Sequence, residues 1–456
     1  MIFTPHNYQQ YAIDKIISTP YVGLFLEMGL GKTVTTLTAI QRLIDNLEIA
    51  KVLVIAPLRV AQSVWVQEID KWEHLKGLRA VRVLGSEKQR VKALNTDADI
   101  YVVNRENVQW LVAYYSGRKI PFDMVVLDEL SSFKNHKSAR WKAMRTMRPR
   151  LSRVVGLTGT PAPNGLIDLW GQVFLLDQGN SLGKFVTNYR QRYFIPGRSN
   201  GQVVFDYKIQ RDGEQRIYDA ISDFCVSMKS EDYLSLPACT YHDIDIELSS
   251  KMLASYQEFE KEKVLSLPEE EDGTISAVNA AALSNKLLQF ASGAVYDADK
   301  NVKHLHDAKL DALVELVEEA NGKPVLVFYQ FKHEIPRMQQ ALKGYGVEVM
   351  NDDTCIDRWN RGEIPVLLAH PASTAYGLNM QQGGNIIIWY GLNWALELYQ
   401  QANARLNRQG QTKPVHVYHL IVSGTMDVEV AKALTGKVAT QDALMGAIKA
   451  VVGRYR

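Results

Sequence analysis

The segment EMGLGKT, residues 27–33, has the composition of a loop that binds phosphate. Its two glycines allow a tight turn that points backbone N–H groups at an anion, and the helix expected after it adds a positive dipole end. Lys32 has the reach to contact the β- and γ-phosphates of ATP, and the Thr33 hydroxyl can bind Mg²⁺. A chance glycine turn is the alternative, since Leu26 stands where the strict pattern has glycine. The nucleotide-binding residues predicted here are Met28, Gly29, Leu30, Gly31, Lys32 and Thr33.

Two adjacent carboxylates, Asp128 and Glu129, end the apolar run MVVLDE. The carboxyl edge of a strand is where α/β sheets bind ligands. We expect Asp128 to hold Mg²⁺, directly or through water, and Glu129 to orient and deprotonate the water that attacks the γ-phosphate. A surface turn carrying two acids is the alternative. Thr158 and Thr160, in GLTGTPAPN after another buried strand, are predicted to sense and relay the state of the phosphate.

Arg405 and Arg408, in QQANARLNRQGQ, are three residues apart and would share one face of a helix predicted over 394–407. Arginines supplied by a separate unit stabilise charge on a transferred phosphoryl group, which makes both candidates for catalysis. A solvated helical face is the alternative for any isolated arginine pair. Their distance along the chain from the phosphate loop favours a motor built from two parts. The predicted catalytic set is Lys32, Asp128, Glu129, Arg405 and Arg408.

The elements that must position these side chains alternate apolar strands with amphipathic helices, which is typical of parallel sheets covered on both faces. Strand-like runs occupy 21–26, 51–56, 98–103, 122–129 and 152–158, and the pattern restarts near 308 with runs at 323–329, 347–350, 364–370, 385–390 and 415–422. Helices are expected over 213–228 and 249–264 in the middle of the chain. We therefore predict an α/β fold with two lobes built alike and helical insertions between them.

The composition is that of an ordinary globular protein. Fifty-two Lys+Arg against 50 Asp+Glu leave a net charge of +2, so any nucleic-acid site must be a local patch. Three widely spaced cysteines exclude a zinc ribbon and a disulfide scaffold. The first residues show no signal pattern, and no run approaches the ~20 apolar residues of a membrane span. We expect a soluble protein of the cytoplasm, with no membrane partner.

Two local patches have the composition of nucleic-acid contacts. Between Lys134 and Arg153 no acid interrupts eight basic residues, and such a run can follow phosphates, although a solvated helix fits it equally well. NYRQRYF, 188–194, interleaves aromatics with Arg190 and Arg192. These aromatics either stack on nucleic acid or belong to the core beside exposed arginines. The eight basic residues of the run are Lys134, Lys137, Arg140, Lys142, Arg145, Arg148, Arg150 and Arg153.

Taken in order, the motifs resemble the Swi/Snf branch of the superfamily-two helicase-like ATPases. The wording of HPASTAYGLN and LYQQANARLNRQGQ is closest to compact bacteriophage members. The acidic box DELS, where DEAH or DEGH is commoner, and the His370-Pro371 pair depart from the pattern. The matching segments are Tyr8-Gln9, 27–33, 56–72, 128–135, 157–170, 326–331, 376–380, 393–411 and 424–430.

The resemblance implies two RecA-like lobes with ATP and Mg²⁺ in the cleft, and DNA-stimulated ATP hydrolysis that drives translocation along double-stranded DNA. Lobe 1 would span 1–235, with a helical protrusion over about 165–235; lobe 2 would span 236–456, with a helical lead-in over about 236–305 and C-terminal helices. The resemblance adds Tyr8, Gln9 and Gly377 as nucleotide contacts and Gln401 as a coupling residue beside Thr158 and Thr160. The expected nucleic-acid contacts are Arg59, Asn104, Lys134, Lys137, Arg140, Asn379 and Trp394.

Two other functions remain open at this point. A strand-separating helicase acting on DNA or RNA shares the same motifs, and a separation pin would have to lie in the middle segment. A nucleotide switch that clamps a partner without turnover is the other alternative. The presence of Lys32, Glu129 and Arg408 argues against such a switch.

Overall fold

The computed structural model divides the chain into two compact units, Met1–Leu234 and Ser235–Arg456. Three predicted site residues, Met28, Thr160 and Gly377, lie outside the residues that the structure describes. The described residues are 1–27, 29–159, 161–162, 165–197, 204, 207–228, 237–266, 276–374, 378–436, 444, 447–448, 450–452 and 454–455.

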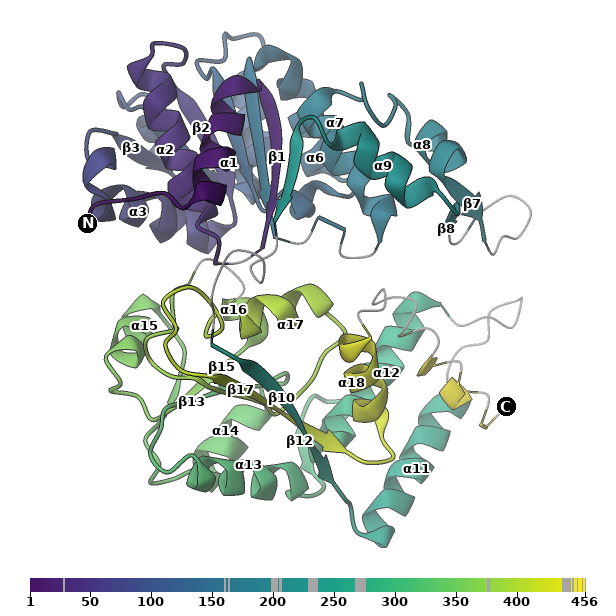
Figure 1. Ribbon diagram of the computed structural model, residues 1–456. Helices are drawn as coiled ribbons and strands as arrows, with labels where there is room; N and C mark the ends of the chain where they lie inside the picture. Colours follow the sequence, from purple (N-terminus) through teal and green to yellow (C-terminus); the bar gives the residue numbers. More distant parts are fainter. Residues whose placement is uncertain are drawn as a thin grey trace. The chain divides into compact units, whose positions relative to one another are not determined.

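Within the described part of unit 1, seven parallel strands form one sheet in the order β3-β4-β2-β5-β6-β1-β9 (Figure 1). The strands are β1 Tyr21–Leu26, β2 Val52–Ala56, β3 Ala80–Val83, β4 Ile100–Asn104, β5 Met124–Asp128, β6 Arg153–Thr158 and β9 Cys225–Met228. The helices are α1 Asn7–Ser18, α2 Lys32–Asp45, α3 Trp65–Lys71, α4 Glu87–Leu94, α5 Val108–Tyr114, α6 Ala139–Met147, α7 Leu169–Asp177, α8 Val186–Tyr193 and α9 Gly213–Ile221. Every residue of β2 and β4 is buried, as their continuous apolar runs require.

Unit 2 has a second parallel sheet, whose described strands run in the order β10-β17-β16-β13-β15-β14. The strands are β10 Cys239–Ile246, β13 Val325–Phe328, β14 Val347–Val349, β15 Val366–Ala369, β16 Ile386–Trp389 and β17 Val415–Val422, with a hairpin of β11 Ala294–Tyr296 and β12 Val302–His304. The helices are α11 Ser250–Leu265, α12 Ala277–Ala291, α13 Ala308–Glu319, α14 Glu334–Ala341, α15 Asp353–Asn360, α16 Pro371–Thr374, α17 Leu396–Asn403 and α18 Met426–Thr435. Two helix-covered parallel sheets confirm the predicted α/β fold.

Two segments predicted to be helical contain strands instead. The helix expected over 213–228 ends at Ile221, and Cys225–Met228 pairs with β1 as the edge strand of the first sheet. The helical lead-in to lobe 2 begins with β10, which pairs along its whole length with β17. Both segments obtain strand conformation from a neighbour far away in the chain, so local periodicity did not reveal them.

Close packing around Gly156 shapes the turn that follows β5. Gly156 pairs with Gly23 of β1, and a Cβ at Gly156 would lie 2.6 Å from a methyl group of Leu130 and 3.1 Å from Leu176. Because Gly156 has no side chain, Leu130 can pack against the sheet directly after the acidic pair. The glycine thus lets the chain turn sharply at Glu129.

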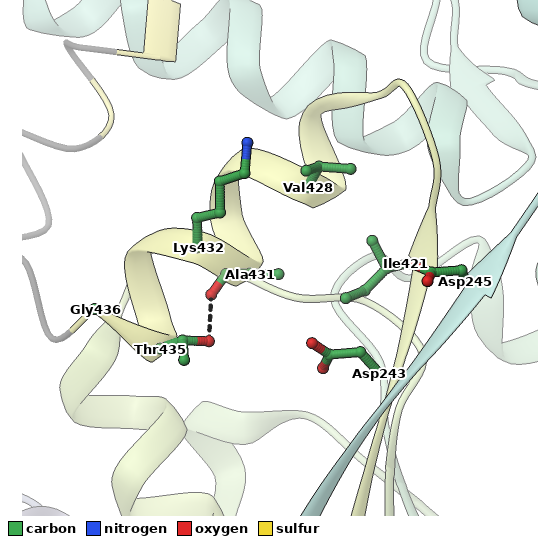
Figure 2. A pocket seen from close by; sticks show the side chains of 8 residues that line it. All are labelled: Asp243, Asp245, Ile421, Val428, Ala431, Lys432, Thr435 and Gly436. Carbon is green, nitrogen blue, oxygen red and sulfur yellow. Dashed lines mark hydrogen bonds between the residues drawn. The ribbon is translucent and has the colours of Figure 1, made fainter.

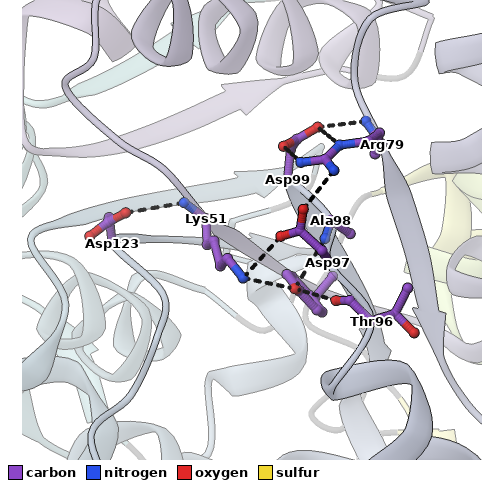
Figure 3. Close-up of polar contacts among 8 residues, drawn as sticks. Lys51, Arg79, Thr96, Asp97, Ala98, Asp99 and Asp123 are labelled. Atoms are coloured by element: carbon purple, nitrogen blue, oxygen red, sulfur yellow. Dashed lines mark hydrogen bonds and ion pairs between the residues drawn. The ribbon is translucent and has the colours of Figure 1, made fainter.

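A network of hydrogen bonds and ion pairs holds the amino ends of several strands of the first sheet (Figure 3). The Asp123 carboxylate accepts hydrogen bonds from the backbone N–H groups of Ala50 and Lys51, at 2.7 and 3.1 Å, where β2 begins. Arg79 pairs with Asp99 at 2.8 Å and with Asp97 at 2.7 Å ahead of β4. The network thus anchors the amino ends of the strands, whereas the predicted phosphate loop lies at their carboxyl ends.

Candidate nucleotide and nucleic-acid sites

The phosphate loop connects β1 to α2 and has the backbone geometry that its glycines predict. Gly29 and Gly31 have φ values of +88° and +75°, a region that residues with a side chain rarely adopt. A Cβ at Gly31 would also lie 2.6 Å from the amide nitrogen of Gln9. Lys32 and Thr33 are the first two residues of α2, which places both at the positive end of the helix dipole.

The Lys32 ammonium makes hydrogen bonds to the start of the loop. Its Nζ donates to the carbonyl oxygens of Leu26, at 2.7 Å, and Glu27, at 3.3 Å. An ammonium with three rotatable protons can exchange such carbonyl contacts for phosphate oxygens at little cost. The position of Lys32 is therefore compatible with the phosphate-binding role predicted for it.

Gln9 braces the loop from α1. Its side chain is 3% exposed, its Nε2 donates to the Leu30 carbonyl at 3.3 Å, and its Oε1 accepts from the His6 backbone N–H at 3.0 Å. Tyr8 is also buried, stacks on the His6 ring at 5.5 Å and has its pKa raised by burial. These contacts show how α1 supports the loop, and nucleotide contact by Tyr8 and Gln9 stays a prediction.

The predicted metal ligand Asp128 ends β5 in a partly desolvated position. The Trp65 indole donates to its Oδ2 at 2.9 Å. Burial raises the pKa of Asp128 to about 6; the neighbouring Glu129 carboxylate raises it further, while Trp65 and the Lys32 ammonium oppose the shift. Trp65 is fully buried, and the sequence motif that contains it did not reveal this contact with the acidic pair.

Glu129 adopts the left-handed conformation, with φ +60° and ψ +63°, which costs a residue with a side chain about 1–3 kcal/mol. Its Oε1 accepts hydrogen bonds from Ser131 Oγ at 2.9 Å and Thr158 Oγ1 at 3.0 Å. Thr158 ends β6, the strand between β5 and β1. The predicted coupling residue therefore contacts the predicted general base directly. Ser131 was missed, although a hydroxyl two residues after the acid was visible in the sequence.

The donor set at this edge of the sheet fits a magnesium nucleotide. The Thr33 hydroxyl, in the first turn of α2, and the Asp128 carboxylate, at the end of β5, are hard oxygen donors, and Mg²⁺ prefers few protein ligands together with phosphate oxygens and water. Among the described residues, no group of three or more His, Cys, Asp and Glu side chains could hold a metal ion alone. Thr33 and Asp128 remain the residues predicted to hold Mg²⁺ together with the nucleotide.

In unit 2 the two predicted catalytic arginines follow a helix rather than lying on it. Helix α17 ends at Asn403, and the chain continues in turns, which corrects the helix predicted over 394–407. The Arg405 Nε donates to the carbonyl of Gln401 at 2.9 Å. An arginine that satisfies a terminal helix carbonyl in this way helps to end the helix.

Both arginines contact the same carbonyl oxygen. Nη1 of Arg405 and Nη1 of Arg408 each lie 3.1 Å from the oxygen of Leu378, in the YGLNM segment. Arg405 is 5% exposed, whereas Arg408 is only partly buried. From the sequence, both arginines were predicted to be catalytic. The structure distinguishes them, because Arg405 is buried and Arg408 is more accessible.

The other predicted site residues of unit 2 differ in burial and in their hydrogen bonds. Gln401 is buried and its Nε2 donates to Glu397 at 3.1 Å. The Trp394 indole donates to Ser284 Oγ of α12 at 2.8 Å, which leaves its ring partly exposed. Asn379 is exposed and so is accessible to a nucleic acid.

The basic run of unit 1 separates into two groups. Lys137, Lys142 and Arg145 are exposed, while Arg140 is half-buried and Lys134 pairs with Asp168 at 3.7 Å. The last three arginines donate to backbone carbonyls: buried Arg148 to Leu175 and Leu176, exposed Arg150 to Tyr115 and Arg118, and half-buried Arg153 to Ile16 and Ile17. The exposed cations of the first part are therefore best placed to follow phosphates, whereas buried Arg148 and half-buried Arg153 are held within the lobe.

Two further predicted nucleic-acid contacts differ in accessibility. Asn104 is 7% exposed; its amide donates to Glu106 at 2.9 Å and its oxygen accepts from Asn107 at 2.5 Å. Arg59 is half-buried at the start of the helical segment after β2. The Asn104 contacts favour a role in shaping the loop after β4 over direct contact with a ligand.

The aromatic residues of NYRQRYF belong to the core. Tyr189, Tyr193 and Phe194 are at most 5% exposed, and the Tyr189 hydroxyl donates to the Leu166 carbonyl at 2.7 Å. Arg192 is exposed, and Arg190 lies over the Tyr207 ring at 4.9 Å. The alternative of buried aromatics beside surface arginines is the correct one of the two that the sequence left open.

A pocket of about 430 Å³ lies beside the edge strand β10 of unit 2 (Figure 2). It contains none of the predicted site residues. The pocket is lined by Asp243, Asp245, Ile421, Val428, Ala431, Lys432, Thr435 and Gly436.

No helix in the described part of the chain has the length and apolar composition of a membrane span.

Comparison with known proteins identifies two domains: an SNF2-related domain over residues 22–292 and a helicase conserved C-terminal domain over 308–410. A protein of Acyrthosiphon pisum secondary endosymbiont phage 1 is 39% identical, over 98% of this chain and 99% of that protein. An ATP-dependent helicase of Mycoplasma genitalium is 28% identical over 90% of this chain, and an ATP-dependent DNA helicase of Arabidopsis thaliana is 24% identical over 92%.

The chain spans nearly all of the phage relative but 39% of the Mycoplasma protein and 58% of the Arabidopsis protein. A solved SWI2/SNF2 ATPase core of Sulfolobus solfataricus in complex with dsDNA is 20% identical, with a TM-score of 0.45 over 100% of this chain and 98% of that one. The SNF2-related domain covers more than half of the chain, and the phage relative matches it almost from end to end. The chain therefore belongs to the SNF2-related family of helicase-like, ATP-hydrolysing enzymes, which confirms the resemblance to the Swi/Snf branch.

Proposed function

We propose that this enzyme hydrolyses Mg-ATP in response to DNA and uses the hydrolysis to translocate along double-stranded DNA in the cytoplasm, without obligatory strand separation. Closure of the two units on each other would complete the catalytic site. Relatives named as ATP-dependent DNA helicases support DNA as the polymer.

The division of the catalytic groups between two units carries this proposal. Lys32, Thr33, Asp128 and Glu129 belong to Met1–Leu234, whereas Arg408 belongs to Ser235–Arg456. Hydrolysis of a phosphoanhydride depends mainly on positioning and on charge stabilisation, with little covalent chemistry for the protein. A site with its arginine on a second unit is therefore inactive until the units close, and DNA bound to both units would favour closure.

Each residue then has a defined task. The loop N–H groups and Lys32 bind the β- and γ-phosphates, and Thr33 and Asp128 hold Mg²⁺, which neutralises phosphate charge when bound. Glu129 accepts the proton of the attacking water, and the Thr158 hydroxyl orients its carboxylate. Arg408 stabilises charge on the γ-phosphoryl group as the bond breaks.

Steady-state ATP hydrolysis with blunt duplex DNA, single-stranded DNA and RNA tests the proposal. Duplex should stimulate turnover most, and Lys32→Ala should abolish turnover with every polymer. Displacement of a third strand from a triplex should report translocation, while a forked duplex should remain paired. Stimulation by single strands together with unwinding of the fork would instead establish a strand-separating helicase, and no stimulation by any polymer would reject a DNA-driven motor.

A further inference from the structure

A two-stranded ribbon extends from the end of α8 in unit 1 and lies apart from the seven-stranded sheet (Figure 1). Its strands are β7 Phe194–Pro196 and β8 Tyr207–Ile209. Phe194 pairs with Ile209 and Ile195 pairs with Lys208, so Ile195 and Lys208 share one face of the ribbon. Phe194 is 5% exposed and Ile195 is 55% exposed. The face that carries Ile195 and Lys208 therefore points to solvent.

The chain around this ribbon has far more positive charge than the rest of the protein. Residues 178–211 contain six basic residues and one acid, which is +5, whereas the whole chain is +2 and the remainder is therefore −3. Such a local excess of charge attracts a polyanion even when the whole protein is almost neutral.

Two exposed arginines flank the base of the ribbon. Arg192 precedes β7 and Arg211 follows β8, beside the hydrogen bond of 2.9 Å from Gln210 N to the Tyr193 carbonyl. Within the described residues, Arg192, Lys208 and Arg211 form no ion pair, whereas neighbouring Arg216 lies 3.5 Å from Asp212. In the part of the chain that the structure describes, these three exposed cations therefore have no acid paired with them, and Lys208 stands opposite the exposed Ile195.

We propose that the ribbon surface formed by Arg192, Ile195, Lys208 and Arg211 is a second DNA contact of unit 1, distinct from the motif residues near the nucleotide. This inference rests on the proposed function, because it takes duplex DNA as the polymer. The three cations bind backbone phosphates, and Ile195 packs against the groove, as apolar residues on DNA-binding ribbons do. Charged residues are depleted at the centre of protein interfaces, so three cations beside the exposed Ile195 (55%) and Ile209 (38%) suit a polyanion better than a protein partner.

The ribbon carries none of the groups that bind or hydrolyse ATP, so its contact serves to retain DNA. A motor must hold the duplex while its units open and close, and a contact confined to one unit remains available throughout. Removing this contact should weaken DNA binding and leave turnover unchanged once DNA is saturating.

The test compares two triple variants of the full chain. Arg192→Gln, Lys208→Gln and Arg211→Gln remove the charges of the ribbon. The matched control replaces Arg82, Lys88 and Lys92 with Gln; these are exposed cations on β3 and α4, also in unit 1. Binding of a labelled duplex is measured over about 0.05–0.2 M salt, a range in which phosphate contacts dominate the salt dependence. Circular dichroism verifies that both variants are folded.

The ribbon variant should reduce the magnitude of the log–log salt slope by about 2 to 3, since each phosphate contact contributes about 0.9. Two lost contacts weaken binding about 60-fold at 0.1 M salt relative to a 1 M reference. Turnover at saturating duplex should match the wild type. Ile195→Ser should weaken binding without changing the slope, because it removes an apolar contact and no charge.

If the ribbon variant and the control variant show the same salt slope of duplex binding, the inference is overturned. It is overturned even if the ribbon surface then proves to bind some other ligand. A loss of turnover at saturating DNA would also overturn it, because the ribbon would then belong to the catalytic cycle. The wild type distinguishes these failures from a failure of the proposed function. If duplex DNA does not stimulate the wild-type enzyme, the proposed function is wrong, whereas stimulation with an unaltered ribbon variant rejects the ribbon alone.

Discussion

Arg405 and Arg408 have equivalent positions in the motif, yet alanine substitutions should impair different properties of the enzyme. Arg405 is 5% exposed and donates to Gln401 O at 2.9 Å and to Leu378 O at 3.1 Å. Hydrogen bonds from a charged donor are each worth about 1.5–3 kcal/mol, and the truncated side chain leaves a cavity. Arg405→Ala should therefore reduce the free energy of unfolding of unit 2 by about 4 kcal/mol.

Arg408→Ala should affect turnover instead. The side chain is only partly buried, and its loss should change the free energy of unfolding by about 1 kcal/mol or less. Loss of an arginine that stabilises transferred phosphoryl charge lowers turnover on the order of 10³-fold, about 4 kcal/mol of transition-state stabilisation. Arg408→Lys should restore only part of this, because an ammonium lacks the planar fork that contacts two oxygens.

Two measurements on each variant separate the effects. Chemical denaturation gives the free energy of unfolding, and ATP hydrolysis at saturating ATP and duplex gives turnover. A fluorescent nucleotide verifies that Arg408→Ala still binds ATP. Near-normal DNA-stimulated turnover in a folded Arg408→Ala variant would refute the arginine assignment. Equal destabilisation by both substitutions would refute the division of roles drawn from their burial.

Three further predictions concern other parts of the chain. Glu129→Gln should bind Mg-ATP normally but hydrolyse it at least about 10²-fold more slowly, as phosphate release will show; parallel loss of nucleotide binding would make the residue structural. Replacing Lys137 and Lys142 with Gln should reduce the salt slope of DNA binding by up to about 1.8, and an unchanged slope would leave both as solvated surface. His333 is buried, which lowers its pKa from near 6.5 to about 4. The unfolded chain therefore takes up the proton first as pH falls, and stability should decrease by about 2 kcal/mol from pH 7 to pH 5. His333→Phe should remove this decrease in denaturation experiments, and an unaltered pH profile would contradict the burial argument.

The strands and helices with strong internal periodicity were predictable, and those that depend on a distant partner were not. Tyr21–Leu26 and Val415–Val422 have the bounds that their apolar runs predicted. Cys225–Met228 and Cys239–Ile246 were assigned to helical regions, because these edge strands obtain their conformation by pairing with β1 or β17. Helix α17 ends at Asn403, and the Arg405 side chain then donates to the carbonyl of Gln401, a contact that spacing alone does not encode.

The sequence by itself determined the chemical inventory of the candidate nucleotide site. Glycines that tolerate positive φ, a lysine and a threonine at a helix start, and carboxylates at a strand end have few other uses in that order. The motifs also sufficed to identify the family, because their order along the chain is far more specific than any one of them.

Only the tertiary structure decided what each charged or polar side chain does within that inventory. Arg148 and Lys142 lie in one basic run, but Arg148 is buried against carbonyl oxygens and Lys142 is exposed to solvent. Thr158 meets Glu129 because β5 and β6 pair, although 29 positions separate them in the chain. The physical reason is common to both cases: a polar group has to be satisfied by water or by protein, and packing between distant segments determines which one is available.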